Sequence, residues 1–241
     1  MIKIEKITKK FGDIIALSEI SFKIEKGEFV FLTGPSGAGK TTLIKLLLVE
    51  YLPTFGEIEI NGEKLSKVSK NKLYLWRRKI GVVFQDYKLF PDQTVLENVA
   101  LPLQISKTPS AELNEKVDKI LNLVGLSERA QLFPAQLSGG ELQRASLARA
   151  VVTGPEILLA DEPTGNLDPK TSAEMMELFK EINKKGTTIL MATHNRGVVD
   201  SFKGRVIELD KGKLIRDEAE GEYQAKDQKS NIKSQKENKD A

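Results

Sequence analysis

The 241-residue chain has no cysteine and a single histidine. The absence of cysteine excludes disulfides, thiolate zinc sites, iron–sulfur clusters and cysteine nucleophiles. It is compatible with a reducing compartment.

Long apolar runs are also missing. No stretch without a charged residue exceeds 11 residues, whereas a membrane-spanning helix needs about 20 apolar residues. The first ten residues, MIKIEKITKK, lack the apolar region of a secretory signal. We therefore expect a cytoplasmic protein that does not itself cross a bilayer.

The charges are nearly balanced, with 37 Lys and Arg against 34 Asp and Glu and a net charge of +3. This balance gives no reason to expect a nucleic-acid partner. The 40% of hydrophobic residues is ordinary for a soluble globular protein. At about 150 residues per domain, the length favours one large domain or one domain with an inserted subdomain.

Hydrophobic patterning predicts an α/β fold. Near-continuous apolar runs at 157–160 and 188–192 are typical of strands that are covered on both faces of a parallel sheet. Further strands are predicted at 2–7, 20–24, 28–33 and 57–60. The apolar segment 42–52 lacks glycine and proline and stops before Pro53, which predicts a buried helix.

The remaining segments suggest an insert and a tail. Between about 86 and 152 the pattern becomes helical, notably over 111–124 and 141–152, which suggests a helical subdomain inserted in the α/β core. Residues 217–241 are polar, with Tyr223 and Ile232 as the only large apolar side chains. Such a segment cannot bury enough surface to offset its ordering entropy. We expect a domain over 1–216 and a disordered charged tail after it.

A phosphate-binding loop is the first chemical motif. Residues 34–41 fit G-x-x-x-x-G-K-[ST] between a predicted strand and a predicted helix, which is the context that this loop requires. Glycines let successive backbone N–H groups turn toward phosphate oxygens, and the helix N-terminus adds partial positive charge. The loop and the residue after it comprise Gly34, Pro35, Ser36, Gly37, Ala38, Gly39, Lys40, Thr41 and Thr42. Lys40 would reach the β- and γ-phosphates, and Thr41 would bind Mg²⁺. The alternative, a plain glycine-rich turn, is disfavoured by the strand–helix context.

Polar residues follow several predicted strands. Asp161 and Glu162 end one buried strand, His194 ends another, and Gln85 ends the strand IGVVF. Open α/β sheets bind ligands at the carboxyl ends of their strands. An acidic pair alone is more often a helix cap, but the phosphate loop favours Asp161 as a Mg²⁺ ligand and Glu162 as the group that deprotonates water.

A second glycine-rich turn, LSGGE, precedes the predicted helix at 141–152. Ser138, Gly139 and Gly140 present exposed N–H groups at a helix N-terminus, which can bind an anion. The same residues with Glu141 also form a capping box, and the two roles are compatible. One chain rarely needs two triphosphate sites, so this turn is best explained if it closes over a nucleotide held by another copy.

In order along residues 1–216, these motifs resemble those of the ATP-binding-cassette (ABC) ATPases. The matching motifs are the phosphate loop, Gln85 in VVFQD, LSGGE at 137–141, ILLADE at 157–162, GNLD at 165–168 and His194 in MATHN. The resemblance implies a P-loop core with a RecA-like mixed or parallel sheet, an antiparallel β subdomain and an inserted α-helical subdomain. It also implies ATP and Mg²⁺ as cofactors and ATP hydrolysis as the activity.

The resemblance assigns further roles. Two copies pack head to tail around two ATP molecules, with Ser138, Gly139, Gly140 and Asp168 acting across the dimer. Phe11 stacks on adenine, although an aromatic residue is otherwise more often part of a core. His194 holds the γ-phosphate, the catalytic water and Glu162, although a lone histidine is more often structural. Gln85 contacts Mg²⁺ and water and transmits their presence to the helical insert.

Within the family, LTG before the loop and MATH near the end resemble the members that act in bacterial cell division with a membrane protein. Exporters of lipoproteins or macrolides share LLADEPTGNLD and remain the near alternative. An ABC ATPase acting on nucleic acid or ribosomes is less compatible, because Gln85 and Ser138 are only 53 residues apart and the chain has one cassette. A nucleotide-binding regulator without turnover would be expected to lack Glu162 or His194. We expect a motor subunit peripheral on the inner face of the membrane.

The partner is expected to dock near residues 90–102. This connection is unusually apolar beside Pro91 and Pro102, so part of it should form an exposed groove for an amphipathic helix. The alternative is that its apolar residues are the core of the helical insert, and for Val95 and Val99 that alternative is favoured.

Overall fold

The computed structural model describes residues 1–219. Its centre is a six-stranded sheet in the order β10-β9-β3-β8-β7-β6. Five strands are parallel, and β10 is antiparallel to β9 at one edge. The strands are β3 (Phe29–Thr33), β6 (Ile80–Val83), β7 (Ile157–Asp161), β8 (Thr188–Ala192), β9 (Arg205–Asp210) and β10 (Lys213–Glu218).

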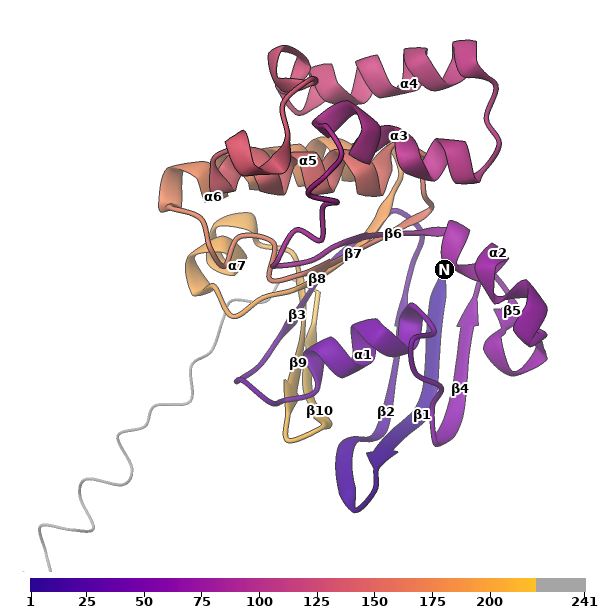
Figure 1. The fold of residues 1–241 in the computed structure, drawn as a ribbon. Helices are drawn as coiled ribbons and strands as arrows, with labels where there is room; N and C mark the ends of the chain where they lie inside the picture. The colour runs from indigo at the N-terminus through magenta and orange to yellow at the C-terminus, as the bar shows by residue number, and fades with distance from the viewer. Residues whose placement is uncertain (220–241) are drawn as a thin grey trace, which may run out of the picture.

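A second, four-stranded sheet is antiparallel, in the order β2-β1-β4-β5. Its strands are β1 (Ile2–Phe11), β2 (Ile14–Ile24), β4 (Phe55–Ile60) and β5 (Glu63–Lys64). Helix α1 (Lys40–Leu47) lies between the two sheets (Figure 1). This arrangement agrees with the predicted mixed sheet and antiparallel β subdomain.

The parallel strands are buried because each faces a hydrophobic layer on both sides. On β7, Leu159 packs in the cluster with α1 and the antiparallel sheet, whereas Leu158 packs in the cluster formed with the helices on the second face. The side chains therefore alternate between two cores, as expected for central strands without polar faces. The helices on the second face are α5 (Gly139–Val151), α6 (Pro169–Lys184) and α7 (Arg196–Phe202).

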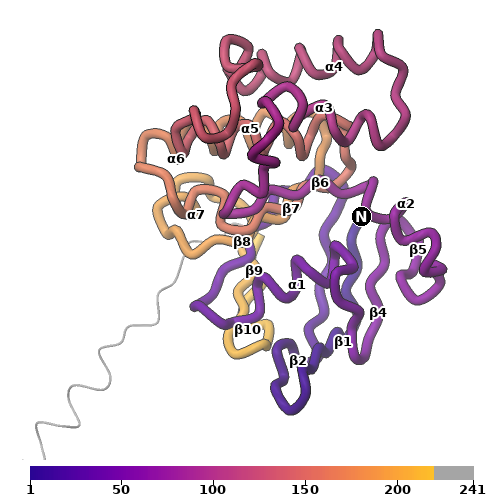
Figure 2. The backbone as a smooth tube through the Cα atoms, viewed as in Figure 1, coloured from indigo at the N-terminus to yellow at the C-terminus, as the bar shows by residue number. Residues whose placement is uncertain are grey.

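Helices α3 (Val95–Ile105), α4 (Ser110–Leu123) and α5 gather at one end of the molecule, beyond β6 and β7 (Figures 1 and 2). They share a third core, which contains Val95, Val99, Leu121 and Ala145. Both α3 and α5 begin with complete capping boxes, Thr94 with Glu97 and Ser138 with Glu141. The predicted helices at 111–124 and 141–152 correspond to α4 and α5.

Short helical turns fill the remaining connections. These are α2 (Leu73–Arg78) and the 3₁₀ turns η1 (Leu65–Lys67), η2 (Lys70–Lys72), η3 (Ser127–Arg129) and η4 (Pro134–Gln136). Within residues 1–219, no helix has the length and apolar character needed to span a membrane.

The helix predicted over 42–52 is shorter in the structure, because α1 ends at Leu47. Val49 adopts a left-handed conformation with φ of 56°, and the N–H groups of Val49 and Glu50 donate to the carbonyls of Leu46 and Lys45. This is the Schellman pattern, which usually requires glycine. The side chains of Trp76 and Arg77 bind the carbonyls that remain unpaired at this helix end.

The predicted start of the tail at Asp217 is also wrong. Asp217 and Glu218 belong to β10, and both oxygens of Asp217 accept hydrogen bonds from Arg205 at 2.7 and 2.8 Å. Backbone pairing with β9 and this bidentate ion pair compensate for the polar composition. The rest of the predicted tail, 220–241, lies outside the described residues.

Candidate active site

The phosphate loop connects β3 to α1, as predicted. Gly39 is the N-cap of α1, with φ of 107°. A Cβ at Gly39 would lie 2.8 Å from the carbonyl oxygen of Ala16, and one at Gly34 would lie 2.1 Å from that of Leu209. Only glycine fits these two positions, because both the backbone conformation and the close neighbours exclude a side chain.

The ammonium group of Lys40 is folded back onto this loop. It donates hydrogen bonds to the carbonyl oxygens of Gly34 at 2.7 Å and Pro35 at 3.1 Å. Burial lowers the pKa of Lys40, while the charges of Glu162 and Asp161 act in the opposite direction. A buried cation at the entry of a helix N-terminus is suited to an anionic ligand.

Asp161 ends β7 opposite the first turn of α1. Burial raises the pKa of its carboxyl, and the hydrogen bond from Thr41 is the largest effect that opposes this rise. Glu162 follows in a left-handed conformation with φ of 50°. A non-glycine residue rarely adopts this conformation, which costs energy and can be part of the construction of a functional site.

His194 follows β8 and faces Glu162. Nδ1 of His194 lies 2.7 Å from Oε1 of Glu162, and the backbone N–H of His194 donates to Oε2 at 3.3 Å. The carboxylate of Glu162 is largely covered, whereas the imidazole is exposed. His194 therefore orients the carboxylate of Glu162, and its exposed imidazole remains accessible from the adjoining cavity.

These groups line one cavity of about 610 Å³. Its walls carry Pro35, Ser36, Gly37, Ala38, Gly39, Lys40, Thr41, Thr42, Gln85, Asp161, Glu162 and His194. The sequence motifs thus converge although they are up to 159 residues apart (35 to 194). Ala16 also lines the cavity, and sequence analysis missed it because a small apolar residue in a strand carries no distinguishing signal.

Gln85 has a partner that the sequence analysis did not identify. Its Nε2 donates to Oδ1 of Asn166 at 3.4 Å, and Nδ2 of Asn166 donates to the carbonyl of Gln85 at 3.3 Å. Asn166 lies within the GNLD motif, so the motif itself was the available signal. This pairing joins the end of β6 to the segment that follows Glu162.

The second glycine-rich turn lies outside this cavity. Ser138 caps α5, and Asp168 caps α6 by accepting from the backbone N–H groups of Lys170 and Thr171. The two helix N-termini are adjacent, since a Cβ on Gly140 would come within 2.6 Å of the Thr171 side chain. A second group of predicted site residues therefore lies away from the phosphate loop of its own chain. Its members are Ser138, Gly139, Gly140 and Asp168.

Phe11 is likewise outside the lining of the cavity. It ends β1, is 40% exposed and contacts Tyr51 edge to face, with ring centroids 5.1 Å apart. Its ring is not part of a core. The available surface is compatible with the predicted stacking on a base.

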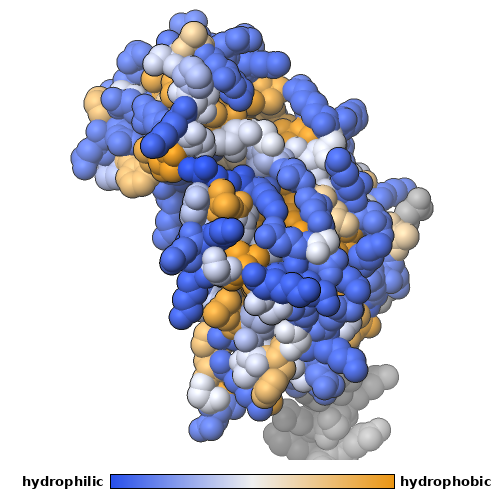
Figure 3. All heavy atoms as spheres, turned by 90° about the vertical axis from the view of Figure 1, so that its right-hand side faces the viewer, coloured by the Kyte–Doolittle hydropathy of each residue, from blue (hydrophilic) through white to orange (hydrophobic). Residues whose placement is uncertain are grey.

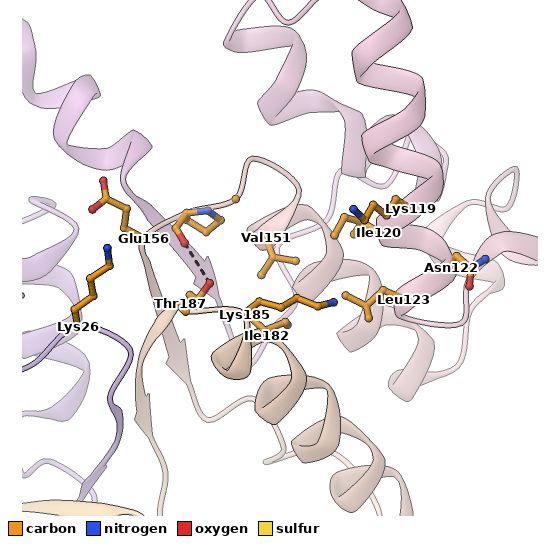
Figure 4. Close-up of a pocket in the computed structure, with 13 residues that line it drawn as sticks. Lys26, Lys119, Ile120, Asn122, Leu123, Val151, Glu156, Ile182, Lys185 and Thr187 are labelled. Atoms are coloured by element: carbon orange, nitrogen blue, oxygen red, sulfur yellow. Dashed lines mark hydrogen bonds between the residues drawn. The ribbon is translucent and has the colours of Figure 1, made fainter.

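A separate hollow of about 690 Å³ lies at the other ends of β7 and β8 (Figure 4). It is lined by Lys119 and Leu123 of α4, Val151 and Ile182. It contains none of the predicted site residues. The chemistry therefore concentrates in the cavity at the phosphate loop.

Comparison with known proteins agrees with this geometry. The family model described as ABC transporter matches residues 17–165, which is more than half of the chain. The chain belongs to the ABC transporter family. The family identified from the motifs is therefore confirmed, together with its α/β fold and ATP as its nucleotide.

Two relatives of this ABC chain are named cell division ATP-binding protein FtsE. The protein from Bacillus subtilis is 48% identical over 224 residues, 92% of this chain and 98% of the relative. That from Mycobacterium tuberculosis is 47% identical over 225 residues, again 92% and 98%. The similarity to cell-division members is therefore confirmed. A solved dimer of the ATP-binding cassette MJ0796 bound to ADP and Pi is 38% identical, covers 92% of this chain and all of the other, and has a TM-score of 0.84.

Proposed function

We propose that this chain is the ATP-binding and ATP-hydrolysing subunit of an FtsEX-type cell-division complex, in which it drives a membrane subunit resembling FtsX. The observation that carries this proposal is the convergence of the phosphate loop, Asp161, Glu162 and His194 in one cavity. The similarity to FtsE proteins, over 92% of this chain and 98% of each relative, supports the choice of partner.

The donor set fits Mg²⁺. Thr41, Asp161 and Gln85 offer hydroxyl, carboxylate and amide oxygens, which are the hard ligands that Mg²⁺ prefers alongside phosphate and water. All three line the same cavity, and Thr41 is already hydrogen-bonded to Asp161. Bound there, Mg²⁺ would neutralise charge on the β- and γ-phosphates.

The protein's own groups supply the remaining chemistry. Lys40 exchanges the carbonyls of Gly34 and Pro35 for phosphate oxygens, and the loop N–H groups hold the same phosphates. Glu162 accepts a proton from the attacking water, while His194 orients Glu162 and faces the γ-phosphate. Phe11 stacks on the adenine.

The second group of residues completes the site from another copy. Ser138, Gly139, Gly140 and Asp168 lie outside the cavity of their own chain. Ser138, Gly139 and Gly140 offer an anion site at the N-terminus of α5, and Asp168, which caps α6, would reach across the dimer. We propose a head-to-tail homodimer in which this group closes over the ATP of the partner. The dimeric MJ0796 cassette supports such an assembly.

The membrane subunit is proposed to dock beside the segment 90–102. Phe90 is 49% exposed and lines a groove, whereas Val95 and Val99 are core residues. Buried Asn98 supports the loop that presents Phe90: Oδ1 accepts from the Phe90 N–H at 2.8 Å, and Nδ2 donates to the carbonyls of Phe90, Gln93 and Thr94 at 3.0 Å. The exposed ring is therefore held on a rigid support.

Gln85 is proposed to transmit closure of the ATP site to the groove. The helical subdomain of about 86–152 would then move relative to the core, and the chain would sit on the inner face of the membrane through its partner. We place the end of the ATPase domain at Glu218, after β10.

Co-purification tests this function. The chain should be recovered from detergent-solubilised membranes with an FtsX-type subunit, hydrolyse ATP only with Mg²⁺, and restore division to cells depleted of FtsE. Recovery with a lipoprotein- or macrolide-exporter subunit instead, without rescue of division, would favour the exporter alternative.

A further inference from the structure

The groove that presents Phe90 has positively charged side chains in its lining. It encloses about 460 Å³ between α2, β6 and the ends of α3 and α5, and its apolar lining includes Tyr74, Phe90, Leu101 and Ile105. Three arginines line the same groove, Arg77, Arg78 and Arg149, and among the described residues no aspartate or glutamate does. Figure 3, which faces the side that carries α2, shows apolar patches interspersed among hydrophilic residues.

Backbone carbonyls are the hydrogen-bond partners of these arginines. Arg78 donates to Ile105 at 3.2 Å, and Arg149 donates to Lys88 at 2.7 Å and Tyr87 at 3.1 Å. Arg77 donates to Leu48 and Val49 at the end of α1. Within residues 1–219, none of the three has a carboxylate within ion-pair distance.

Most arginines outside the groove are paired with a carboxylate. Four of the five, Arg129, Arg196, Arg205 and Arg216, each form an ion pair with an aspartate or glutamate. Within residues 1–219, Arg144 is the exception. A guanidinium carries several N–H donors in a fixed fork that fits a carboxylate. Arg78 also lies over the Tyr74 ring, 5.2 Å from its centroid, but no carboxylate of residues 1–219 neutralises the charge of the groove arginines. Burial lowers the pKa of Arg149, so its charge is partly removed from water, and no carboxylate of the described part of the chain lies beside it.

We propose that the segment docking in this groove is an amphipathic helix that places carboxylate side chains against Arg78 and Arg149 and apolar side chains against Phe90 and Ile105. This inference rests on the proposed function and specifies its partner chemically. The complementary charges would fix the register of the helix, and an ion pair partly shielded in a groove contributes more than an exposed one.

Arg78 is the residue to change, because it is exposed and has no role in the ATP site. The FtsX-type subunit encoded with this chain is the probe, co-purified in detergent at low and high salt. Arg78→Glu should reduce recovery about tenfold or more, Arg78→Lys should retain most of it, and Lys119→Glu, at the rim of the other hollow (Figure 4), should change nothing. A glutamate-to-lysine change in the partner's docking helix should restore binding to Arg78→Glu.

Unchanged thermal midpoint and ATP affinity would establish that Arg78→Glu is folded. Wild-type recovery of a folded Arg78→Glu, with recovery lost for Phe90→Asp, would overturn the inference and leave the docking site intact. Failure of the wild-type chain to bind the subunit would overturn the proposed function and this inference together. Arg78-dependent binding to phosphatidylglycerol vesicles, without a partner, would assign the groove to lipid instead.

Discussion

Glu162 and His194 meet at the ends of adjacent parallel strands, with Nδ1 of the histidine 2.7 Å from Oε1 of the glutamate. Glu162 adopts a left-handed backbone conformation, φ 50°, to present its carboxylate there. Its N–H also donates to the carbonyl of Ala192, the last residue of β8. The strained residue is thus held by backbone and side-chain bonds to the same neighbouring strand.

This relationship predicts the effect of Glu162→Gln. The amide keeps the shape but cannot accept the proton, so hydrolysis should fall by at least about two orders of magnitude while ATP binding persists. ATP should then hold two subunits together. Sedimentation of the variant with Mg-ATP checks this: a strictly monomeric variant, or one with wild-type turnover, would contradict the role of Glu162.

Lys40→Ala tests the phosphate loop. The ammonium of Lys40 now binds two loop carbonyls, and its loss should weaken ATP binding because a charge-assisted contact to phosphate disappears. Isothermal titration with ATP measures the change, and Lys119→Ala, on α4 away from the ATP cavity, is the control. Equal ATP affinity in wild type and Lys40→Ala would count against the loop assignment.

The strand ends were the informative part of the sequence. Asp161, Glu162 and His194 could be placed at one sheet edge because parallel strands direct their carboxyl ends to the same side. The residues that were missed depend on contacts between distant segments. Asn166 pairs with Gln85 across 81 residues, and the carbonyls at the end of α1, which stops at Leu47, accept hydrogen bonds from Trp76 and Arg77. Such tertiary contacts leave no local pattern.

The segment from Phe90 to Val99 also contains both a feature that local sequence predicts and one that it does not. All are apolar and close in sequence, yet Val95 and Val99 are 1% and 0% exposed and Phe90 is 49% exposed. The helical period of α3 accounts for the buried valines. Phe90 lies before that helix, and its exposure depends on the hydrogen bonds of Asn98.

Asp161→Asn should raise the stability of the nucleotide-free protein. The pKa of Asp161 is raised, chiefly by burial, so the folded state binds its proton more tightly and loses stability as pH rises above the ordinary carboxyl range. At pH 7 the neutral amide avoids this cost. Thermal unfolding should show a higher midpoint for the variant without ligand, and no difference at pH values where the carboxyl is protonated in both states. With Mg-ATP the order should reverse, and a lower ligand-free midpoint would contradict the argument.

Glu141 should lower the stability of the protein as pH falls, the opposite direction to the effect of Asp161. Hydrogen bonds from the backbone and side chain of Ser138, and then from Arg129, lower the pKa of Glu141 to about 2. Its stabilising contribution is therefore complete above the ordinary glutamate pKa and is lost as pH falls toward about 2. Gln can occupy the same capping position without titrating.

Urea unfolding between pH 6 and 3 should therefore show a smaller loss of stability for Glu141→Gln than for wild type. Glu174→Gln, on the exposed face of α6, should follow the wild-type curve. Parallel curves for wild type and Glu141→Gln would mean that the capping box does not contribute through its charge.

Phe90→Asp tests where the membrane subunit docks. Phe90 is half-exposed, and its backbone rather than its ring is held by Asn98, so a charged side chain should leave the fold and ATP affinity near wild type. It should abolish co-purification with the membrane subunit and in-cell function, because an aspartate cannot replace the apolar contact in the groove. Phe55→Asp, an equally drastic change on the exposed antiparallel sheet, should bind the subunit normally. If Phe90→Asp still co-purifies, the coupling surface lies elsewhere; if it unfolds the protein, Phe90 belongs to the core of the helical subdomain after all.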